Sequence, residues 1–233
     1  FMDRITGELS ALGSVSGNDA QRKLLYIAEL TRKLDEFNVI LERWIKMRKG
    51  DMNLQIENFA LSDIFAIILK SKPLLENKGI SLDVKPADSV VKADKALTLF
   101  MVNTLVDNAA KFTPHGGKVS VECIEHDECV EIAVTDTGIG LSQHDIDRIL
   151  GEKVYNASEI GKGNESLDQK KKGGGFGLMN CKGIIEKYRK SGGIFKVCSM
   201  GIESRQGEGS RFSFRLPKGV MRVLLMLLML FPV

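Results

Sequence analysis

A long stretch from Asp19 to Lys49 contains no Pro or Gly, and it constrains the fold of this chain more than any other feature. Apolar residues recur within it at spacings of 3, 4, 3, 4 and 3: Ile27, Leu30, Leu34, Phe37, Leu41 and Trp44. A seam of this period buries one narrow stripe of a helix against partner helices. Asn18 or Asp19 is expected to cap the helix, and Gly50 to end it.

A shorter helical pattern precedes this stretch, with apolar residues at Met2, Ile5, Leu9 and Leu12. The flexible link 13–17 (GSVSG) joins the two patterns, which predicts an antiparallel helical hairpin. The arms do not match, because the second is about 46 Å long and the first about 18 Å. Either the first arm continues upstream of Phe1 or another chain covers the longer seam. Residues 1–50 are therefore interpreted as a truncated dimerisation hairpin from a homodimeric protein.

The remaining chain alternates helical and extended patterns. Residues 53–61 look extended, and Ser62 or Asp63 is expected to cap a helix that carries Ile64, Ile67, Ile68 and Leu75. Further helices are expected at 95–112 and 176–190, strands at 80–85, 118–125, 129–136, 194–199 and 211–216, and a Gly- and Lys-rich loop at 151–175. These elements predict an α+β fold in which helices pack on one sheet with antiparallel connections.

Composition excludes several functions. The formal net charge is +3 and the charges alternate in sign, so binding of nucleic acid is not expected. The four cysteines form no C-x-x-C pair and no zinc spacing with the three histidines, which indicates buried thiols in a reducing cytoplasm. The tail 218–233 becomes apolar from Val220 onward. It is either a helix packed on the core, a non-native addition or the start of a membrane segment, although a full span needs about 20 residues.

Two glycine-bearing segments are candidates for ligand binding. Asp136–Gly140 (DTGIG) follows a predicted strand, where glycines let the backbone approach a flat ligand and the carboxylate accepts from an amino group. Gly173–Leu178 (GGGFGL) leads into a predicted helix, where converging N–H groups can bind phosphate. Taken singly, the first also fits a tight turn and the second a flexible hinge.

Two further segments complete the set. Gly207–Phe214 (GEGSRFSF) is by itself an ordinary hairpin turn that opens the last strand. On the predicted helix with the sequence NTLVDNAAKF, Asn108 and Lys111 are three residues apart and share a face. An amide oxygen can ligate Mg²⁺ and an ammonium can neutralise a phosphate, although an ordinary solvated face would look the same.

The order and spacing of these four segments resemble the catalytic domain of sensor histidine kinases, in the GHKL (Bergerat) ATP-binding superfamily. The resemblance covers residues 53–217, which are expected to form an α/β sandwich that binds ATP and Mg²⁺. It implies that Asn108 ligates Mg²⁺, that Lys111 meets a phosphate and that Asp136 accepts from the adenine amino group. The other ATP-binding positions it implies are Gly138, Gly140, Gly173, Gly175, Gly177, Leu178 and Ser210. Residues 152–172 correspond to an ATP lid with Lys162, Lys170, Lys171 and Lys172.

Departures from the family pattern leave alternatives open. The family has a second Asn one turn before the Mg²⁺ ligand, where this chain has Thr104. The aromatic box of the family is poorly matched by residues 150–158 (LGEKVYNAS), in which Tyr155 is the only aromatic residue. None of the histidines, His115, His126 and His144, lies in the hairpin, so the phosphoacceptor is expected upstream of Phe1, or else the parent is a pseudokinase.

The preferred interpretation is the catalytic part of a dimeric histidine kinase. It would transfer the γ-phosphoryl group of ATP to a histidine and then to a response-regulator aspartate. It would lie in the cytoplasm as part of a membrane-associated bacterial sensor, touching the membrane only through flanking or C-terminal segments. The alternatives are a degenerate nucleotide-binding or dimerisation module, or a related ATPase. An ATPase would need a water-activating Glu where this chain has Thr104.

Overall fold

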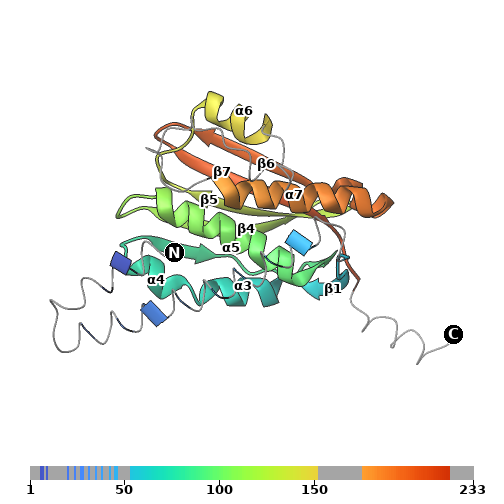
Figure 1. Ribbon diagram of the computed structural model, residues 1–233, viewed down its shortest axis with the longest axis horizontal. Helices are drawn as coiled ribbons and strands as arrows, with labels where there is room; N and C mark the ends of the chain where they lie inside the picture. The colour runs from blue at the N-terminus through green and yellow to red at the C-terminus, as the bar shows by residue number, and fades with distance from the viewer. Residues whose placement is uncertain are drawn as a thin grey trace. The chain divides into compact units, whose positions relative to one another are not determined.

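The computed structural model of the chain describes residues 53–151 and 175–220, together with isolated positions between Thr6 and Lys46 (Figure 1). The chain divides into two compact units, Phe1–Leu54 and Gln55–Val233. Within the described ranges, no helix has the length and apolar content needed to cross a bilayer.

The first unit is helical at each described position between Thr6 and Lys46. The Thr31 hydroxyl donates to the carbonyl of Ile27 one turn earlier at 2.9 Å, and Lys46 pairs with Glu42 at 2.7 Å. These contacts fit the predicted second arm. Of the predicted seam, only Ile27 is described. The other seam residues and the link 13–17 lie outside the described residues, so the hairpin and its dimer remain predictions.

The second unit contains a small and a large sheet. In the small sheet, β1 (Glu57–Ala60) pairs with β3 (Val90–Ala93) in antiparallel register. Lys218 and Gly219 return to this sheet, because Lys218 bridges Val91 and the Gly219 N–H donates to the Val90 carbonyl at 2.8 Å. Residues 218–220 thus lie beside β3, and the rest of the tail is outside the described residues.

The large sheet has five strands in the order β2-β4-β5-β7-β6. Their bounds are β2 Ser81–Val84, β4 Lys118–Glu125, β5 Cys129–Asp136, β6 Ser199–Arg205 and β7 Gly209–Pro217. The pairs β4–β5, β5–β7 and β6–β7 are antiparallel as expected, but β2 pairs with β4 in parallel. The expectation that all connections are antiparallel was therefore wrong for β2, which joins β4 through a crossover containing β3 and a long helix.

Helices cover one face of the large sheet, as Figure 1 shows for α5 and α7. The helices are α3 (Leu61–Leu69), α4 (Lys72–Glu76), α5 (Lys95–Phe112), α6 (Gln143–Gly151) and α7 (Gly175–Ser191), with the 3₁₀ helix η2 at Gly193–Val197. Fully buried side chains between helices and sheet include Ile64, Ile68, Leu97, Met101, Leu105, Ile132, Ile184 and Phe214. The expected α+β sandwich is confirmed.

Three expectations about local structure were wrong. The helix expected to carry Leu75 stops at Leu69, and Leu75 lies in the separate α4. Pro73 in the first turn of α4 explains the break, because proline starts a helix readily but cannot continue one. The start of α3 is Leu61 after Ala60, without a side-chain cap from Ser62 or Asp63.

The segment 194–199 was expected to be a strand, yet most of it forms η2 and the strand starts at Ser199. Phe195 is buried and its ring stacks on that of Tyr188, with centroids 5.5 Å apart. This packing against α7 outweighs the β-propensity of the segment. Strand β3 and helix α6 were not expected from the sequence.

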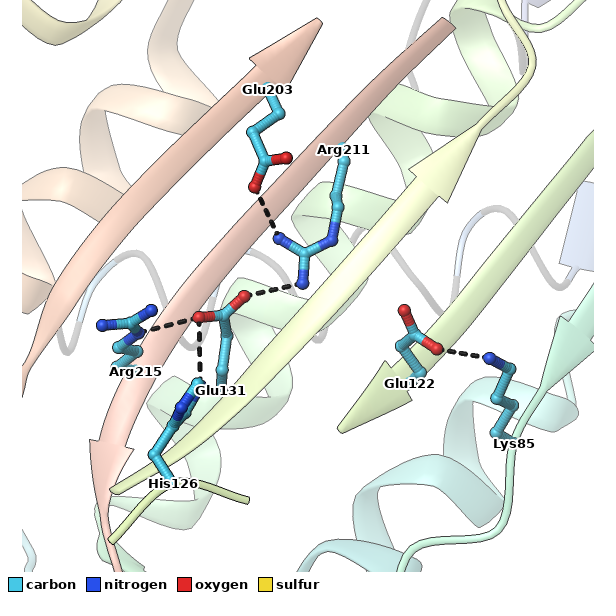
Figure 2. A network of polar contacts seen from close by, with 7 residues as sticks. All are labelled: Lys85, Glu122, His126, Glu131, Glu203, Arg211 and Arg215. Atoms are coloured by element: carbon cyan, nitrogen blue, oxygen red, sulfur yellow. Dashed lines mark hydrogen bonds and ion pairs between the residues drawn. The ribbon is translucent and has the colours of Figure 1, made fainter. Parts of the chain in front are cut away.

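The opposite face of the large sheet carries a network of charged side chains (Figure 2). Glu131 is 5% exposed and accepts from Arg211 Nη2 at 2.6 Å and from Arg215 Nε at 2.7 Å. His126 Nε2 lies 3.5 Å from the same carboxylate. Burial by itself would raise the pKa of Glu131, but the hydrogen bonds and charges of the two arginines outweigh it and lower the pKa to about 2.

Candidate functional site

Asp136 lies at the end of β5 on the helix-covered face. Side chains alternate along a strand, so Asp136 faces the same way as the buried Ile132 and Val134. It is 4% exposed, and its Oδ1 accepts from the Gly138 N–H at 2.7 Å. Burial raises the pKa of this carboxyl, against the opposing hydrogen bonds from the N–H groups of Gly138 and Ser210. Among the described residues no Lys, Arg or His pairs with it. Asp136 is thus a buried acceptor without a counter-ion.

The loop after Asp136 runs between the end of α5 and the β6–β7 turn. The Ile139 N–H donates to the Phe112 carbonyl at 3.2 Å, and the Ile139 carbonyl accepts from the Gly207 N–H at 2.8 Å. Both glycines of the loop are required by this fit. A Cβ at Gly138 would lie 2.6 Å from the Phe112 carbonyl oxygen, and one at Gly140 (φ +65°) 2.0 Å from that of Arg205. The predicted role of the glycines in a close backbone approach fits this geometry.

The β6–β7 turn brings a third glycine against Asp136. Gly209 has φ +102°, and a Cβ there would lie 2.0 Å from the Asp136 carbonyl oxygen. The expected hairpin turn that opens the last strand is confirmed, because residues 206–208 join the antiparallel strands β6 and β7, and the turn also packs on the candidate site. Ser210 follows it, is buried and pairs with Asp136 in register. Cross-strand partners share a face of the sheet, so the two side chains are neighbours.

Helix α5 presents Asn108 at the same end of the unit. Its start is fixed by Asp94, whose side chain accepts from the Leu97 N–H at 3.2 Å as an N-cap. Asn108 Nδ2 is buried and has no hydrogen-bond partner among the described residues. The assignment of amide O and N in Asn is interchangeable, so the observation is that one polar atom of this side chain is unsatisfied. Lys111 is exposed, with Nζ 5.0 Å from the centre of the Phe112 ring.

Helix α7 packs against α5 through Gly177. A Cβ at Gly177 would lie 2.8 Å from the methyl group of Thr104. Thr104 also hydrogen-bonds Cys181, one turn further along α7, and burial raises the pKa of that thiol to about 12. Thr104 therefore serves helix packing at the position where a second Asn was expected. Leu178 is buried, and Gly175 begins the helix.

The structure brings part of the predicted site together. Asp136, Gly138, Gly140 and Ser210 form one cluster, while Asn108 and Gly177 lie on the two helices that pack on each other. Gly173 and the lid lysines Lys162, Lys170, Lys171 and Lys172 lie outside the described residues. Of the cysteines, all four are free thiols, and Cys123 is only half-buried.

The sequence did not point to Ser204. Its hydroxyl accepts from the Leu141 N–H at 2.8 Å and contacts the Ser210 hydroxyl at 2.9 Å. A serine three residues before the expected turn at Gly207 carries no signal of its own. If the bounds of β6 had been predicted correctly, the pairing of β6 with β7 would have placed Ser204 beside Ser210.

Comparison with known proteins identifies this arrangement. The model of the family "Histidine kinase-, DNA gyrase B-, and HSP90-like ATPase" matches residues 93–220, more than half of the chain. The chain belongs to this ATPase family. The chain is 37% identical over 132 residues to the histidine protein kinase DivJ of Caulobacter vibrioides, a match that covers 57% of this chain and 19% of DivJ. It is 30% identical over 211 residues to the sensor histidine kinase GacS of Pseudomonas protegens, covering 84% of this chain and 21% of GacS.

Solved structures share the fold of this chain. The catalytic domain of the histidine kinase ThkA superposes with a TM-score of 0.54 at 20% identity, over 70% of this chain and 98% of that domain. Full-length ShkA gives a TM-score of 0.58 at 19% identity, over 86% of this chain and 40% of ShkA. The chain thus corresponds to the catalytic ATP-binding part of sensor histidine kinases, and it spans about a fifth of the length of DivJ and GacS.

Proposed function

We propose that this chain binds Mg²⁺-ATP and supplies the catalytic part of a protein-histidine kinase. The γ-phosphoryl group passes to the imidazole nitrogen of a histidine, with loss of ADP, and then to an aspartate of a response-regulator receiver domain. The observation that carries the proposal is the buried Asp136 carboxylate, which has no counter-ion among the described residues and precedes a loop in which a Cβ at Gly138 or Gly140 would collide with backbone. Such an acceptor suits a neutral donor such as the adenine amino group.

The phosphate end of the nucleotide is assigned to α5 and α7. The unsatisfied polar atom of Asn108 fits a role as Mg²⁺ ligand, because its amide oxygen is then engaged by the metal. Among the described residues, no group of three His, Cys, Asp or Glu could hold a metal ion. Magnesium bound through one amide, phosphates and water needs no such cage. When bound, the ion offsets the charge that develops on the transferred phosphoryl group.

The remaining roles in the phosphate region follow from position. Lys111 is exposed near the end of α5, one turn after Asn108, and its long side chain can carry the ammonium to a phosphate bound beside that helix end. The start of α7 offers backbone N–H groups that can donate to a phosphate, and Gly175 and Gly177 add no side chain of their own there. Thr104 is engaged by Cys181 and carries no carboxylate that would activate water, which favours transfer to a protein over hydrolysis.

The partners of the whole protein are proposed on the same basis. A homodimer through the hairpin would cover the seam of the first unit, and a receiver domain would accept the phosphoryl group. The ATPase unit is assigned to the cytoplasm because ATP and receiver domains are found there. ShkA, whose fold this chain shares, has been solved in complex with the ATP analogue AMPPNP.

Calorimetric titration with AMPPNP, with and without Mg²⁺, tests the nucleotide site. The wild type is expected to bind AMPPNP more tightly with Mg²⁺ than without it. In Asn108→Ala this gain in affinity should be about tenfold smaller, as for the loss of one charge-assisted contact. Asn103→Ala, a neighbouring Asn on the same helix, is the matched control and should keep the Mg²⁺ effect. No binding of AMPPNP by the wild type would refute the proposed function.

A further inference from the structure

Three polar side chains form a row across the end of the large sheet. Asp136 on β5 pairs with Ser210 on β7, and Ser210 pairs with Ser204 on the edge strand β6. Partners in register share a face, so all three lie on the helix-covered side. Asp136 and Ser210 belong to the proposed ATP site, whereas Ser204 stands one strand further away.

The hydrogen bonds of Ser204 are fully used. Its hydroxyl donates to the Gly209 carbonyl at 2.8 Å and accepts from the Leu141 N–H at 2.8 Å. The contact with the Ser210 hydroxyl is 2.9 Å long. A serine hydroxyl has one proton and two acceptor positions. Because the proton of Ser204 goes to Gly209, Ser210 must be the donor in the contact between the two serines.

This assignment determines what Ser210 offers to a ligand. Its proton is directed at Ser204, so only lone pairs remain for any further contact. The neighbouring Asp136 carboxylate offers only acceptors when it is ionised. Together they form an end of the sheet that accepts hydrogen bonds and donates none from its side chains.

We propose that Ser204 is a positioning residue that makes this end of the sheet selective for a purine with an amino group at C6, as in adenine, over one with an oxo group at C6, as in guanine. It does so by directing the Ser210 proton away from the ligand and by fixing Leu141 at the end of the loop 136–141. The inference rests on the proposed ATP site and adds to it the residue that sets the polarity of Ser210. An adenine base presents a donor at the corresponding edge, and a guanine base presents an oxygen there.

Substitution of Ser204 separates this role from general stabilisation. In Ser204→Ala the Ser210 proton is released toward the ligand and the Leu141 N–H loses its acceptor. We expect the affinity for ADP to fall about tenfold while that for GDP changes little, because one buried donor is left unsatisfied and one is misdirected. Ser204→Thr keeps the hydroxyl and should restore the ratio of the ADP and GDP affinities. Both affinities are measured by calorimetry without Mg²⁺.

Ser213→Ala is the matched control. Ser213 is a buried serine on β7, three residues from Ser210 and therefore on the opposite face of the sheet. It should leave the ratio of affinities unchanged. An equal loss of ADP and GDP affinity in Ser204→Ala would show a merely structural role and overturn the inference.

Hydrogen exchange of the Leu141 amide in the ligand-free protein gives a second readout that needs no nucleotide. The amide should exchange about tenfold faster in Ser204→Ala than in the wild type or in Ser213→Ala, as for one lost hydrogen bond. Unchanged exchange would overturn the inference even if nucleotide binds. A wild type that protects Leu141 but binds neither ADP nor GDP would instead refute the proposed function, and the selectivity assigned to Ser204 with it.

Discussion

Strand β5 carries two buried carboxylates, one on each face, and their surroundings differ. Glu131 faces the side without α5 and α7, where Arg211 and Arg215 donate to it and lower its pKa to about 2. Asp136 faces the helices, where burial raises its pKa and backbone N–H groups of Gly138 and Ser210 are its donors. The same strand thus holds one carboxylate whose charge is satisfied by the protein and one whose charge is not.

This difference separates structure from function. The charge of a buried carboxylate with two guanidinium partners is already balanced, so we expect Glu131 to join β5 to β7 rather than to bind a ligand. A buried carboxylate without a cation costs stability. Such a carboxylate is typical of a binding site, where the ligand supplies the missing hydrogen-bond donor. The comparison predicts that changes at Asp136 affect binding and changes at Glu131 affect stability.

The largest expected effect is on nucleotide binding by Asp136→Asn. The amide keeps an acceptor for the Gly138 N–H but directs a donor at the amino group of the base. AMPPNP affinity should fall roughly 100-fold, or about 2.7 kcal/mol, as when a site that recognises one polar group meets a mismatched one. Thermal unfolding should show equal or higher stability, because a desolvated charge is removed. Lost binding accompanied by unfolding would show that Asp136 has a structural role, and the comparison would fail.

Glu131→Gln should lower stability and leave nucleotide binding unchanged, the opposite of the outcome expected for Asp136→Asn. Removing the charge leaves two arginines without their shared carboxylate, although both can partly reach solvent. We expect the free energy of unfolding to fall by about 2–3 kcal/mol, below the full cost of breaking a buried ion pair. Urea unfolding measures this. Glu203→Gln is the control, since Glu203 binds Arg211 at 3.0 Å but is largely exposed, and it should cost much less. AMPPNP affinity should stay within about twofold in both variants.

The two carboxylates also predict opposite dependences of stability on pH. The folded-state pKa of Glu131 lies below its unfolded value of 4.5, so its contribution is present above pH 4.5 and is lost as the pH falls toward about 2. The folded-state pKa of Asp136 lies above its ordinary value of 3.8, so its contribution weakens as the pH rises through that range. Between pH 5 and 3, the wild type should lose roughly 2 kcal/mol more stability than Glu131→Gln. Parallel stability curves for the two proteins would contradict the charge assignment of Glu131.

Sequence alone predicted the parts of the site that depend on local chemistry. The expected helix 95–112 agrees with α5, and the two strands 118–125 and 129–136 agree with β4 and β5 in both bounds. Asp136, Gly138 and Gly140 could be singled out because their segment belongs to a set of four whose order and spacing resemble the histidine-kinase catalytic domain, although the segment alone also fits a tight turn. The collisions that a Cβ would meet at both glycines give the physical reason for that pattern.

What the sequence could not predict depends on contacts between distant segments. The burial of Phe195 against Tyr188 converts an expected strand into η2 and shifts β6 to Ser199. With β6 misplaced, neither the register of Ser204 nor its bonds to Leu141 and Ser210 could be inferred. The engagement of Thr104 by Cys181 on α7 was equally hidden, because no local pattern relates two helices that are far apart in sequence.

The smallest effect is expected on the same open face of the sheet, at Lys85. Figure 2 shows its ammonium paired with Glu122, one strand away from the Glu131 cluster. The Lys85 side chain is 56% exposed, so water replaces its partner readily when the pair is broken. Lys85→Ala should therefore cause no measurable change in the midpoint of urea unfolding or in AMPPNP affinity. A loss of stability as large as that of Glu131→Gln would mean that the charged face acts as one cooperative network. The contrast between the two carboxylates of β5 would then reflect position in that network rather than burial and pairing.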